Sequence, residues 1–197
     1  EELTAEELGG AMTHATTSGV AHFLYKSEKN CLGGVRELLS YLPDNNQAPL
    51  PVKTGKSVDH CKKLVDIVPD NKKKSYDVHD VINAMIDKDS FFEVQKHWAK
   101  NAVVGFGRME GNTVGFVCNQ ANHKGGSLDI DSSDKIARFI RFCDCFNIPL
   151  VSLIDVPAFL PGSEQEHNGI IRHGAKILFA YAEATVPKIS LIMRKAY

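Results

Sequence analysis

The residues whose types and spacing could support chemistry are concentrated in one segment, DVPAFLPGSEQEHNG at residues 155–169. This segment follows a continuous apolar run, so it would lie beyond the carboxyl end of a buried strand, where α/β sheets bind their ligands. Prolines on both sides stiffen Phe159 and Leu160, and a helix beginning at Asn168 or Gly169 would offer free N–H groups to an anion. The segment predicts the wall of a pocket or, alternatively, a plain connection between strand and helix.

The familiar catalytic sets are incomplete in this sequence. Ser163, His173 and Asp155 could form a hydrolytic triad, but Ser163 lacks the G-x-S-x-G surroundings that would expose its hydroxyl. The histidine spacings also differ from the i, i+4 pair of a helical metal site. His14 and His22 are eight residues apart, and His167 and His173 are six residues apart. We therefore expect most histidines to be structural or surface residues.

The composition narrows the class of protein. A chain of 197 residues with 43% hydrophobic content can bury a core, and a net charge of -1 gives no electrostatic footprint for nucleic acid or an anionic membrane. Its five cysteines show no metal-ligand spacing and are expected to be reduced core residues in a reducing compartment. No export signal or membrane-spanning run is recognised.

In the second half of the chain, the apolar periods predict a layered α/β domain. The predicted order is hairpin, helix, strand, helix, strand, over strands 103–109 and 113–119, helix 132–146, strand 149–155, helix 168–184 and strand 187–193. The segment from Glu110 to Asn112 suits the hairpin turn, and Ser132 and Ser133 are expected to cap the following helix. Both strands after the hairpin are expected to be buried.

The first half of the chain carries weaker patterns. Helical spacing predicts a helix over 30–42 that Pro43 ends, and Asp77 is expected to cap a short helix over 78–86. Between them, the composition from Pro43 to Ser75 predicts an exposed connection. Its lysine run at 72–74 favours a solvated surface over a phosphate-binding patch.

Five segments resemble one known family, the carboxyltransferase subunits of biotin-dependent acyl-CoA carboxylases. They occur in the family's order, span nearly the whole chain and read ELGGAMTHATTSGVAHF at 7–23, RELLSYLPDNN at 36–46, GSLDIDSSDKIARFIRFCDCFNIPL at 126–150, DVPAFLPG at 155–162 and IIRHGAKILFAYAEATVPK at 170–188. The same family includes methylmalonyl-CoA decarboxylase and transcarboxylase subunits.

The resemblance implies an α/β fold of the crotonase-like (ClpP/crotonase) kind, a ββα spiral, with parts of two such domains. Residues 1–50 would be the C-terminal tail of the first carboxyltransferase domain, 51–77 a linker, and 78–197 the first part of the second domain. We expect an internal piece of a longer protein, because the sequence opens in a helical pattern and closes on a strand pattern.

The implied chemistry is transfer of a carboxyl group from carboxybiotin to the alpha carbon of propionyl-CoA, giving methylmalonyl-CoA. The biotin nitrogen removes the proton next to the thioester, so the protein supplies mainly orientation and backbone N–H groups for two oxyanions. Both oxyanion turns are expected outside residues 1–197. No catalytic residue and no metal ion is therefore expected in this stretch, which alone would be catalytically incomplete.

The resemblance also implies site residues. It places a pocket shared by acyl-CoA and biotin at Val156, Ala158, Phe159, Leu160, Gly162, Gly169 and Ile170. In the first domain, the LGGA-x-x-H-x-x-x-SG motif would lie near the active face through Gly9, Gly10, His14, Ser18 and Gly19, with packing as the alternative role for the glycines. Family members usually read VPGFLPG and EYGGIIRH, and this chain departs at Ala158, His167 and Asn168. The methyl group of Ala158 would restrict the loop or fill part of the pocket.

The implied partners are acyl-CoA as substrate and biotin carried by a partner, either a biotin carboxyl carrier or a biotin carboxylase subunit. The family also implies a homo-hexamer in the bacterial cytoplasm or the mitochondrial matrix, with no nucleic acid and no membrane insertion. Two alternatives stay open. One is the alpha subunit of a methylmalonyl-CoA decarboxylase (a sodium pump) or a transcarboxylase subunit, and the other is a non-catalytic interaction scaffold.

Overall fold

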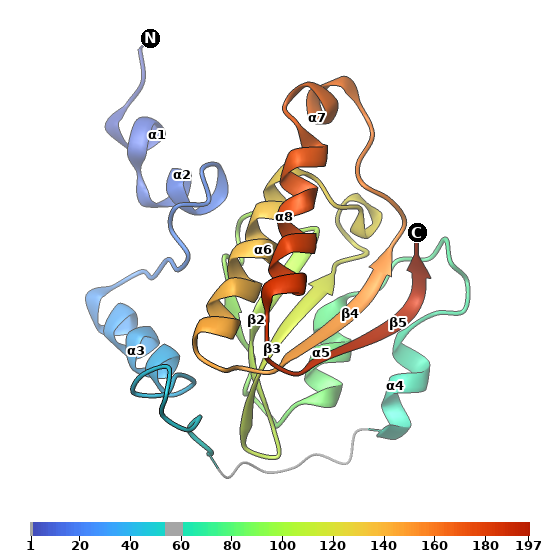
Figure 1. The fold of residues 1–197 in the computed structure, drawn as a ribbon. Helices are drawn as coiled ribbons and strands as arrows, with labels where there is room; N and C mark the ends of the chain where they lie inside the picture. Colours follow the sequence, from blue (N-terminus) through green and yellow to red (C-terminus); the bar gives the residue numbers. More distant parts are fainter. Residues whose placement is uncertain (1, 54–60) are drawn as a thin grey trace.

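A five-stranded mixed sheet lies between helices on its two faces (Figure 1). The computed structural model describes residues 2–53 and 61–197. Part of the predicted linker, residues 54–60, lies outside the described residues, as do the side chains of residues 61–63. The sheet has the order β1-β2-β3-β4-β5, so each strand pairs with the next one along the chain.

The first three strands form an antiparallel meander made of β1 (Phe92–Val94), β2 (Ala102–Met109) and β3 (Asn112–Asn119). Glu110 and Gly111 connect β2 to β3 with φ angles of 51° and 81°, as the tight turn of a twisted hairpin requires. The predicted hairpin is confirmed. β1 was missed, because three residues are too few to show an alternating pattern.

The next two strands, β4 (Leu150–Val156) and β5 (Lys188–Ala196), run parallel to β3. The crossover helices α6 (Ile130–Cys145) and α8 (Ile170–Glu183) pack against each other on one face of the sheet. This arrangement follows from the strand order, because successive parallel strands that are also neighbours need crossovers on the same side. The predicted helix–strand–helix–strand order is confirmed.

The cap of α6 differs from the prediction. Asp129 is the N-cap, and its carboxylate accepts a hydrogen bond from the N–H of Ser132 at 2.9 Å. Ser132 returns the contact, since its hydroxyl oxygen accepts from the N–H of Asp129 at 2.8 Å. Ser132 and Ser133 therefore lie inside the helix, and the prediction that they cap it was wrong by one turn.

The other face of the sheet carries α5 (Val78–Met85), capped as predicted by Asp77, and α4 (Cys61–Ile67). Leu64 and Ile67 of α4 pack onto the core cluster beneath α5. The prediction of a plain exposed connection from Pro43 to Ser75 was therefore wrong for α4, whose apolar residues are too few to reveal a helix by period. The lysine run at 72–74 is exposed, as expected.

His79 ties α5 to β1 and makes the stability of this corner depend on pH. Its Nδ1 lies 2.7 Å from Asp77 Oδ1 and its Nε2 lies 3.0 Å from Glu93 Oε2. The hydrogen bond to Glu93, ahead of the contacts with Asp77 and against the cost of burial, raises the pKa of His79 to about 8.

Because the folded pKa lies above the unfolded value, the stabilisation is complete below about pH 6.5 and is lost as the pH rises through about 8. We expect the free energy of unfolding to fall by about 1 to 2 kcal/mol across this range. Urea titrations at closely spaced pH values would measure the slope. The His79→Gln variant should lack it, and an unchanged slope in that variant would assign the effect to another group.

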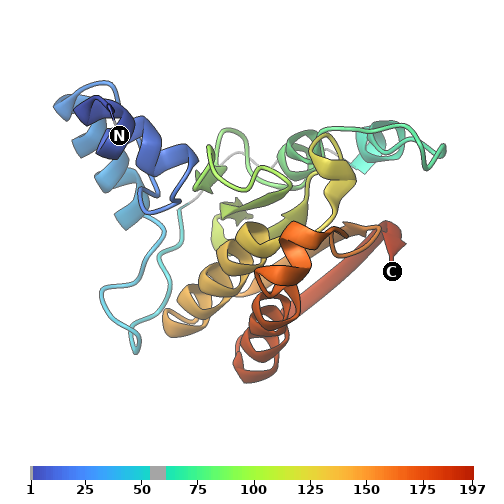
Figure 2. The same cartoon turned by 90° about the horizontal axis from the view of Figure 1, so that it is seen from above.

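The N-terminal segment contributes α1 (Ala5–Gly9), α2 (Ala11–Thr16) and α3 (Glu28–Leu39) at the β1 edge of the sheet (Figure 2). Tyr41, just beyond α3, is 3% exposed and belongs to the core cluster that α6 and α8 cover. Its hydroxyl donates to the carbonyl of Ser90 at 2.7 Å, and the Arg108 guanidinium lies 4.2 Å from its ring centroid. The segment thus shares a core with the sheet, and the division into two domains stays a prediction.

The last strand is the exception to the predicted burial. Ile189, Leu191 and Ile192 are 65%, 46% and 61% exposed. β5 lies at the edge of the sheet, where β4 pairs with it on one side. Its Met193 packs onto the core cluster beneath α5, but the other three apolar side chains stay largely exposed. The apolar run predicted a strand correctly, but burial depends on neighbours that the pattern does not specify.

The cysteines are only partly core residues. Cys118 and Cys143 are buried as expected, whereas Cys31 and Cys145 are exposed, and all four are free thiols.

Within the described residues, none of the helices is long and apolar enough to cross a bilayer. Two further short helices lie among the described residues, the 3-10 turn η1 (Lys124–Gly126) and α7 (Ser163–His167).

Candidate functional site

The segment predicted to form a pocket wall is anchored at its centre. After β4 ends, the carbonyl of Ala158 accepts from the N–H of Leu128 at 3.1 Å, and the N–H of Leu160 donates to the carbonyl of Leu128 at 2.7 Å. Leu128 and Phe159 thereby form an isolated parallel bridge. These two main-chain hydrogen bonds fix the loop beside Leu128, just before α6. The geometry therefore favours a pocket wall over a plain connection.

An apolar cavity of about 410 Å³ lies beneath this loop, within the size range of small-molecule sites. Val156, Ala158 and Phe159 contribute to its wall from the predicted set. The remaining lining comes mostly from the sheet and the two helices, with Leu128 before α6 and Tyr197 after β5: Val117, Cys118, Asn119, Leu128, Ile136, Ser152, Ile154, Gly174, Ile177, Leu178, Tyr181, Ser190 and Tyr197. A cavity of this size and character can hold a short acyl chain or a small ring system.

Gly174 packs closely against Phe159 in the wall of this cavity. A Cβ atom at Gly174 would lie 2.7 Å from Phe159 Cε1, so only glycine leaves room for the ring. A polar pair in the lining is formed by Ser152 Oγ and Tyr181 Oη, which lie 2.7 Å apart. Phe159 itself is 48% exposed, which places it at the mouth of the cavity.

Four predicted pocket residues do not line the cavity. Gly162 precedes α7 with a φ angle of 134°, and Gly169 is the N-cap of α8 with a φ angle of 84°, so both serve the backbone turns of the loop. Ile170 is 4% exposed and packs inward, and Leu160 is half-buried beside the bridge to Leu128. Their place in a substrate site stays a prediction.

The departure at Ala158 carries no backbone strain. Ala158 is absent from the non-glycine residues with positive φ, so its methyl group is compatible with the conformation of the loop. The methyl instead occupies part of the cavity wall. Of the two effects expected for this alanine, the structure favours filling of the pocket over restriction of the loop.

The hydrolytic triad does not form. Asp155 Oδ2 accepts from Arg194 Nη2 at 2.8 Å, and His173 Nδ1 lies 3.0 Å from Asp134. Asp155 and His173 are thus engaged with different partners, and Ser163 opens the exposed helix α7. Among the described residues, no cluster of His, Cys, Asp or Glu side chains is arranged to hold a metal ion.

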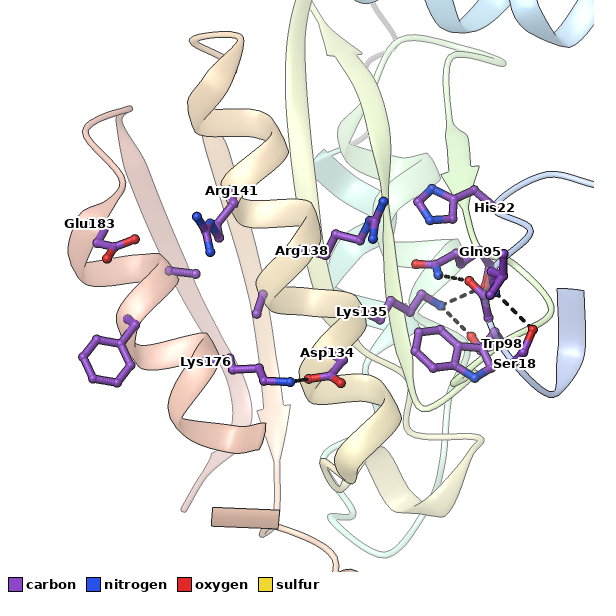
Figure 3. Close-up of a pocket in the computed structure, with 15 residues that line it drawn as sticks. Ser18, His22, Gln95, Trp98, Asp134, Lys135, Arg138, Arg141, Lys176 and Glu183 are labelled. Atoms are coloured by element: carbon purple, nitrogen blue, oxygen red, sulfur yellow. Dashed lines mark hydrogen bonds and ion pairs between the residues drawn. The ribbon is translucent and has the colours of Figure 1, made fainter. Parts of the chain in front are cut away.

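A second cavity, of about 800 Å³, lies between the N-terminal segment and the outer groove of α6 and α8 (Figure 3). Arg138, Arg141 and Lys176 bring positive charge to it, and Asp134 and Glu183 bring negative charge. Lys176 Nζ donates to Asp134 Oδ1 at 2.7 Å. The excess of cations makes the cavity favourable for an anionic group.

The first-domain motif reaches this second cavity only through its last two residues, Ser18 and Gly19. His14 stands behind them, with Nδ1 2.9 Å from Ser18 Oγ. Gly9 ends α1, and Gly10 joins α1 to α2 where a Cβ would lie 2.5 Å from the Glu6 carbonyl oxygen. Packing therefore accounts for Gly10, and the functional role of the motif stays a prediction.

The sequence analysis placed only Ser18 and Gly19 of this lining near a site and missed the rest, among them Gln95, Trp98 and Lys135. Gln95 and Trp98 lie in a loop without a recognisable motif. Lys135 gave a usable signal, because it precedes Ile136 and lies one turn before Phe139 on the buried stripe of α6, where a lysine is unusual. His22 also lines this cavity, and burial, assisted by the charge of Arg138, lowers its pKa.

Comparison with known proteins gives a consistent result over the whole sequence. The carboxyl transferase domain family matches residues 1–197. The carboxyltransferase subunit of propionyl-CoA carboxylase from Haloferax mediterranei is 57% identical, over 100% of this chain and 39% of the relative. The methylmalonyl-CoA decarboxylase subunit alpha of Propionigenium modestum is 52% identical, over 100% of this chain and 38% of the relative.

Solved structures agree with this result. The transcarboxylase 12S hexamer crystallised with methylmalonyl-coenzyme A and methylmalonic acid has a TM-score of 0.94 at 49% identity, covering 96% of this chain and 37% of the other. The chain spans 37% to 39% of the length of these proteins. It belongs to the carboxyl transferase domain family, and its fold is the α/β, crotonase-like fold of that family.

Proposed function

We propose, on the premise of this family membership, that the intact protein transfers a carboxyl group from carboxybiotin to the alpha carbon of propionyl-CoA and forms methylmalonyl-CoA. The observation that carries the proposal is the family match over all 197 residues together with 57% identity to a propionyl-CoA carboxylase carboxyltransferase subunit. The apolar cavity beneath the 155–162 loop supports it, because a short acyl chain needs an apolar wall of this kind.

In this mechanism, biotin supplies the carboxyl group and the base. The residues of the described chain bind and orient the reactants: Val156, Ala158 and Phe159 exclude water at the cavity mouth, while Gly162 and Gly169 shape the loop that carries them. We assign Leu160 and Ile170 to the support of that loop. The backbone donors for the two oxyanions belong to other parts of the intact protein, so residues 1–197 alone do not complete a turnover.

The fit of the cavity to biotin rests on size and polarity. The lining is mostly apolar, and its volume of about 410 Å³ admits a bicyclic ring or a short acyl chain. Biotin would arrive on a partner, a biotin carboxyl carrier or a biotin carboxylase subunit. The intact protein would assemble as a hexamer, as transcarboxylase 12S does. We place it in the bacterial cytoplasm or the mitochondrial matrix.

The domain organisation is proposed on the same basis. Residues 1–50 would be the tail of a first carboxyltransferase domain, 51–77 the linker and 78–197 the opening of a second domain. Residues 54–60 of that linker lie outside the described part of the chain.

The test is carboxyl transfer by the intact protein. With carboxylated biotin carrier, we expect carboxyl transfer that depends on propionyl-CoA, measured as formation of methylmalonyl-CoA. The 197-residue chain assayed alone is expected to show no transfer. Turnover by that chain would contradict its proposed incompleteness, and an inactive intact protein would contradict the proposed function.

A second candidate has a specific observation in its favour, because 52% identity to a methylmalonyl-CoA decarboxylase alpha subunit is close to the 57% above. Sodium-dependent loss of carbon dioxide from methylmalonyl-CoA without ATP would favour the decarboxylase.

A non-catalytic scaffold is distinguished by titrating the intact protein with acyl-CoA and biotin, since a scaffold needs to bind neither.

A further inference from the structure

Lys135 is a buried cation without a buried counter-charge in contact. Lys135 is 1% exposed, and the three N–H groups of its Nζ lie within reach of four main-chain carbonyls: Gln95 at 3.1 Å, Trp98 at 2.8 Å, Ala102 at 2.8 Å and, as the longest contact, Ala99 at 3.4 Å. No carboxylate of the described residues pairs with it. Burying an ammonium group in this way is costly unless its donors are satisfied, and burial lowers the pKa of Lys135 to about 8, against the favourable charge of Glu93. The carbonyls are the groups in direct contact with the charge.

The loop over residues 95–102, which leads from β1 into β2, surrounds this ammonium group. Gln95 and Ala99 have φ angles of 52° and 43°, the left-handed region that non-glycine residues rarely adopt. Such strained residues persist only where the surroundings determine them strongly. Here their carbonyls, with those of Trp98 and Ala102, converge on one point, as carbonyl oxygens do around a potassium ion in a selectivity filter.

The same loop holds the N-terminal segment in place. Gln95 Nε2 donates to the carbonyl of Gly19 at 2.7 Å, and the N–H of Gln95 donates to the carbonyl of His22 at 3.0 Å. The Trp98 ring lies against Gly19 so closely that a Cβ there would be 2.4 Å from it. Trp98 Nε1 has no hydrogen-bond partner within the described residues, so no side-chain hydrogen bond fixes the ring, and its position rests on packing and on the backbone that carries it.

We propose that Lys135 is a built-in cation: its ammonium group occupies a carbonyl cage in the 95–102 loop and thereby fixes the Trp98–Gly19 contact that joins the N-terminal segment to the sheet domain. Lys135 is a positioning residue for the wall of the 800 Å³ cavity, where Ser18, Gly19, Gln95 and Trp98 meet. This inference is independent of the reaction proposed above, because it concerns contacts within the chain.

The chain offers its own reporter, since Trp98 is its single tryptophan. Lys135→Met keeps the length of the side chain without its charge, and Lys135→Ala leaves space for a small amine. In both variants, we expect the Trp98 emission maximum to move to longer wavelength and acrylamide quenching to increase several-fold. Lys176→Ala is the matched control, because this lysine lines the same cavity but donates to Asp134 rather than to the loop.

Rescue by an added amine distinguishes a cation in a cage from a residue that only fills space. Propylammonium should restore the wild-type Trp98 emission in Lys135→Ala, whereas tetramethylammonium, which has no N–H donor, should not. Lys135→Met should respond to neither. The Gly19→Ala variant, in which the added methyl expels the ring while the cage stays intact, provides the reference spectrum of a displaced Trp98.

If Lys135→Ala does not fold by itself, the rescue is measured as the yield of folded chain after refolding with propylammonium or tetramethylammonium at equal ionic strength. A higher yield with propylammonium supports the proposal. Equal yields, equal effects of both amines on emission, or a wild-type Trp98 spectrum in Lys135→Met would overturn it.

Discussion

Replacing Asp155 by alanine should lower the free energy of unfolding by about 3 to 5 kcal/mol, because it leaves a buried guanidinium without its counter-charge. The side chains of Asp155 and Arg194 are 1% and 6% exposed, and Oδ2 of Asp155 accepts two hydrogen bonds from Arg194, at 2.9 and 2.8 Å. Asp155 Oδ1 also accepts from the N–H of Lys195 at 3.1 Å. One carboxylate thus fastens the end of β5 to the end of β4.

Urea denaturation, followed by circular dichroism, would measure this loss. Asp70→Ala is the matched control, because Asp70 is exposed and should change stability by less than about 0.5 kcal/mol. The double variant Asp155→Ala/Arg194→Met should recover part of the loss, since it removes both buried charges. If Asp155→Ala were as stable as the Asp70→Ala control, the pair would have no structural role.

Gly174→Val should lower carboxyl transfer by the intact protein by about 100-fold, because a misplacement near 1 Å in a positioned site has effects of this size. The valine Cβ would lie 2.7 Å from the Phe159 ring, so the ring and the 155–162 loop must shift. Helix propensity alone predicts no loss of stability, since valine is a better helix former than glycine. The effect should therefore appear as lost transfer in a folded protein.

Gly33→Val is the matched control for this prediction. Gly33 is also a helical glycine, in α3, and a Cβ there meets no atom within 4 Å. It should retain full transfer activity and equal or greater stability. Steady-state transfer with propionyl-CoA, alongside thermal unfolding of both variants, tests the pair. Undiminished transfer by Gly174→Val would show that the cavity beneath the loop is not the place where a reactant binds.

The sequence alone determined the elements that depend on local pattern. The turn at Glu110 and Gly111, the α6 stripe through Phe139 and Ile140, and the apolar run of β4 were all readable, because backbone period and turn chemistry are properties of neighbours in the chain. Five ordered segments also identified the family, since long contiguous motifs carry far more information than composition. The loop at 155–162 followed from its position after a buried strand.

Only the tertiary structure decided which residues meet. Asp155 turns to Arg194, 39 residues away, and Lys135 meets carbonyls at least 33 residues away, so neither contact leaves a local signature. The exposure of β5 and the packing of Tyr41 into the core of the sheet domain likewise depend on which surfaces come together. An apolar pattern indicates that a side chain can be buried. It does not indicate which surface will cover that side chain, because contacts between residues distant in sequence depend on the topology of the fold.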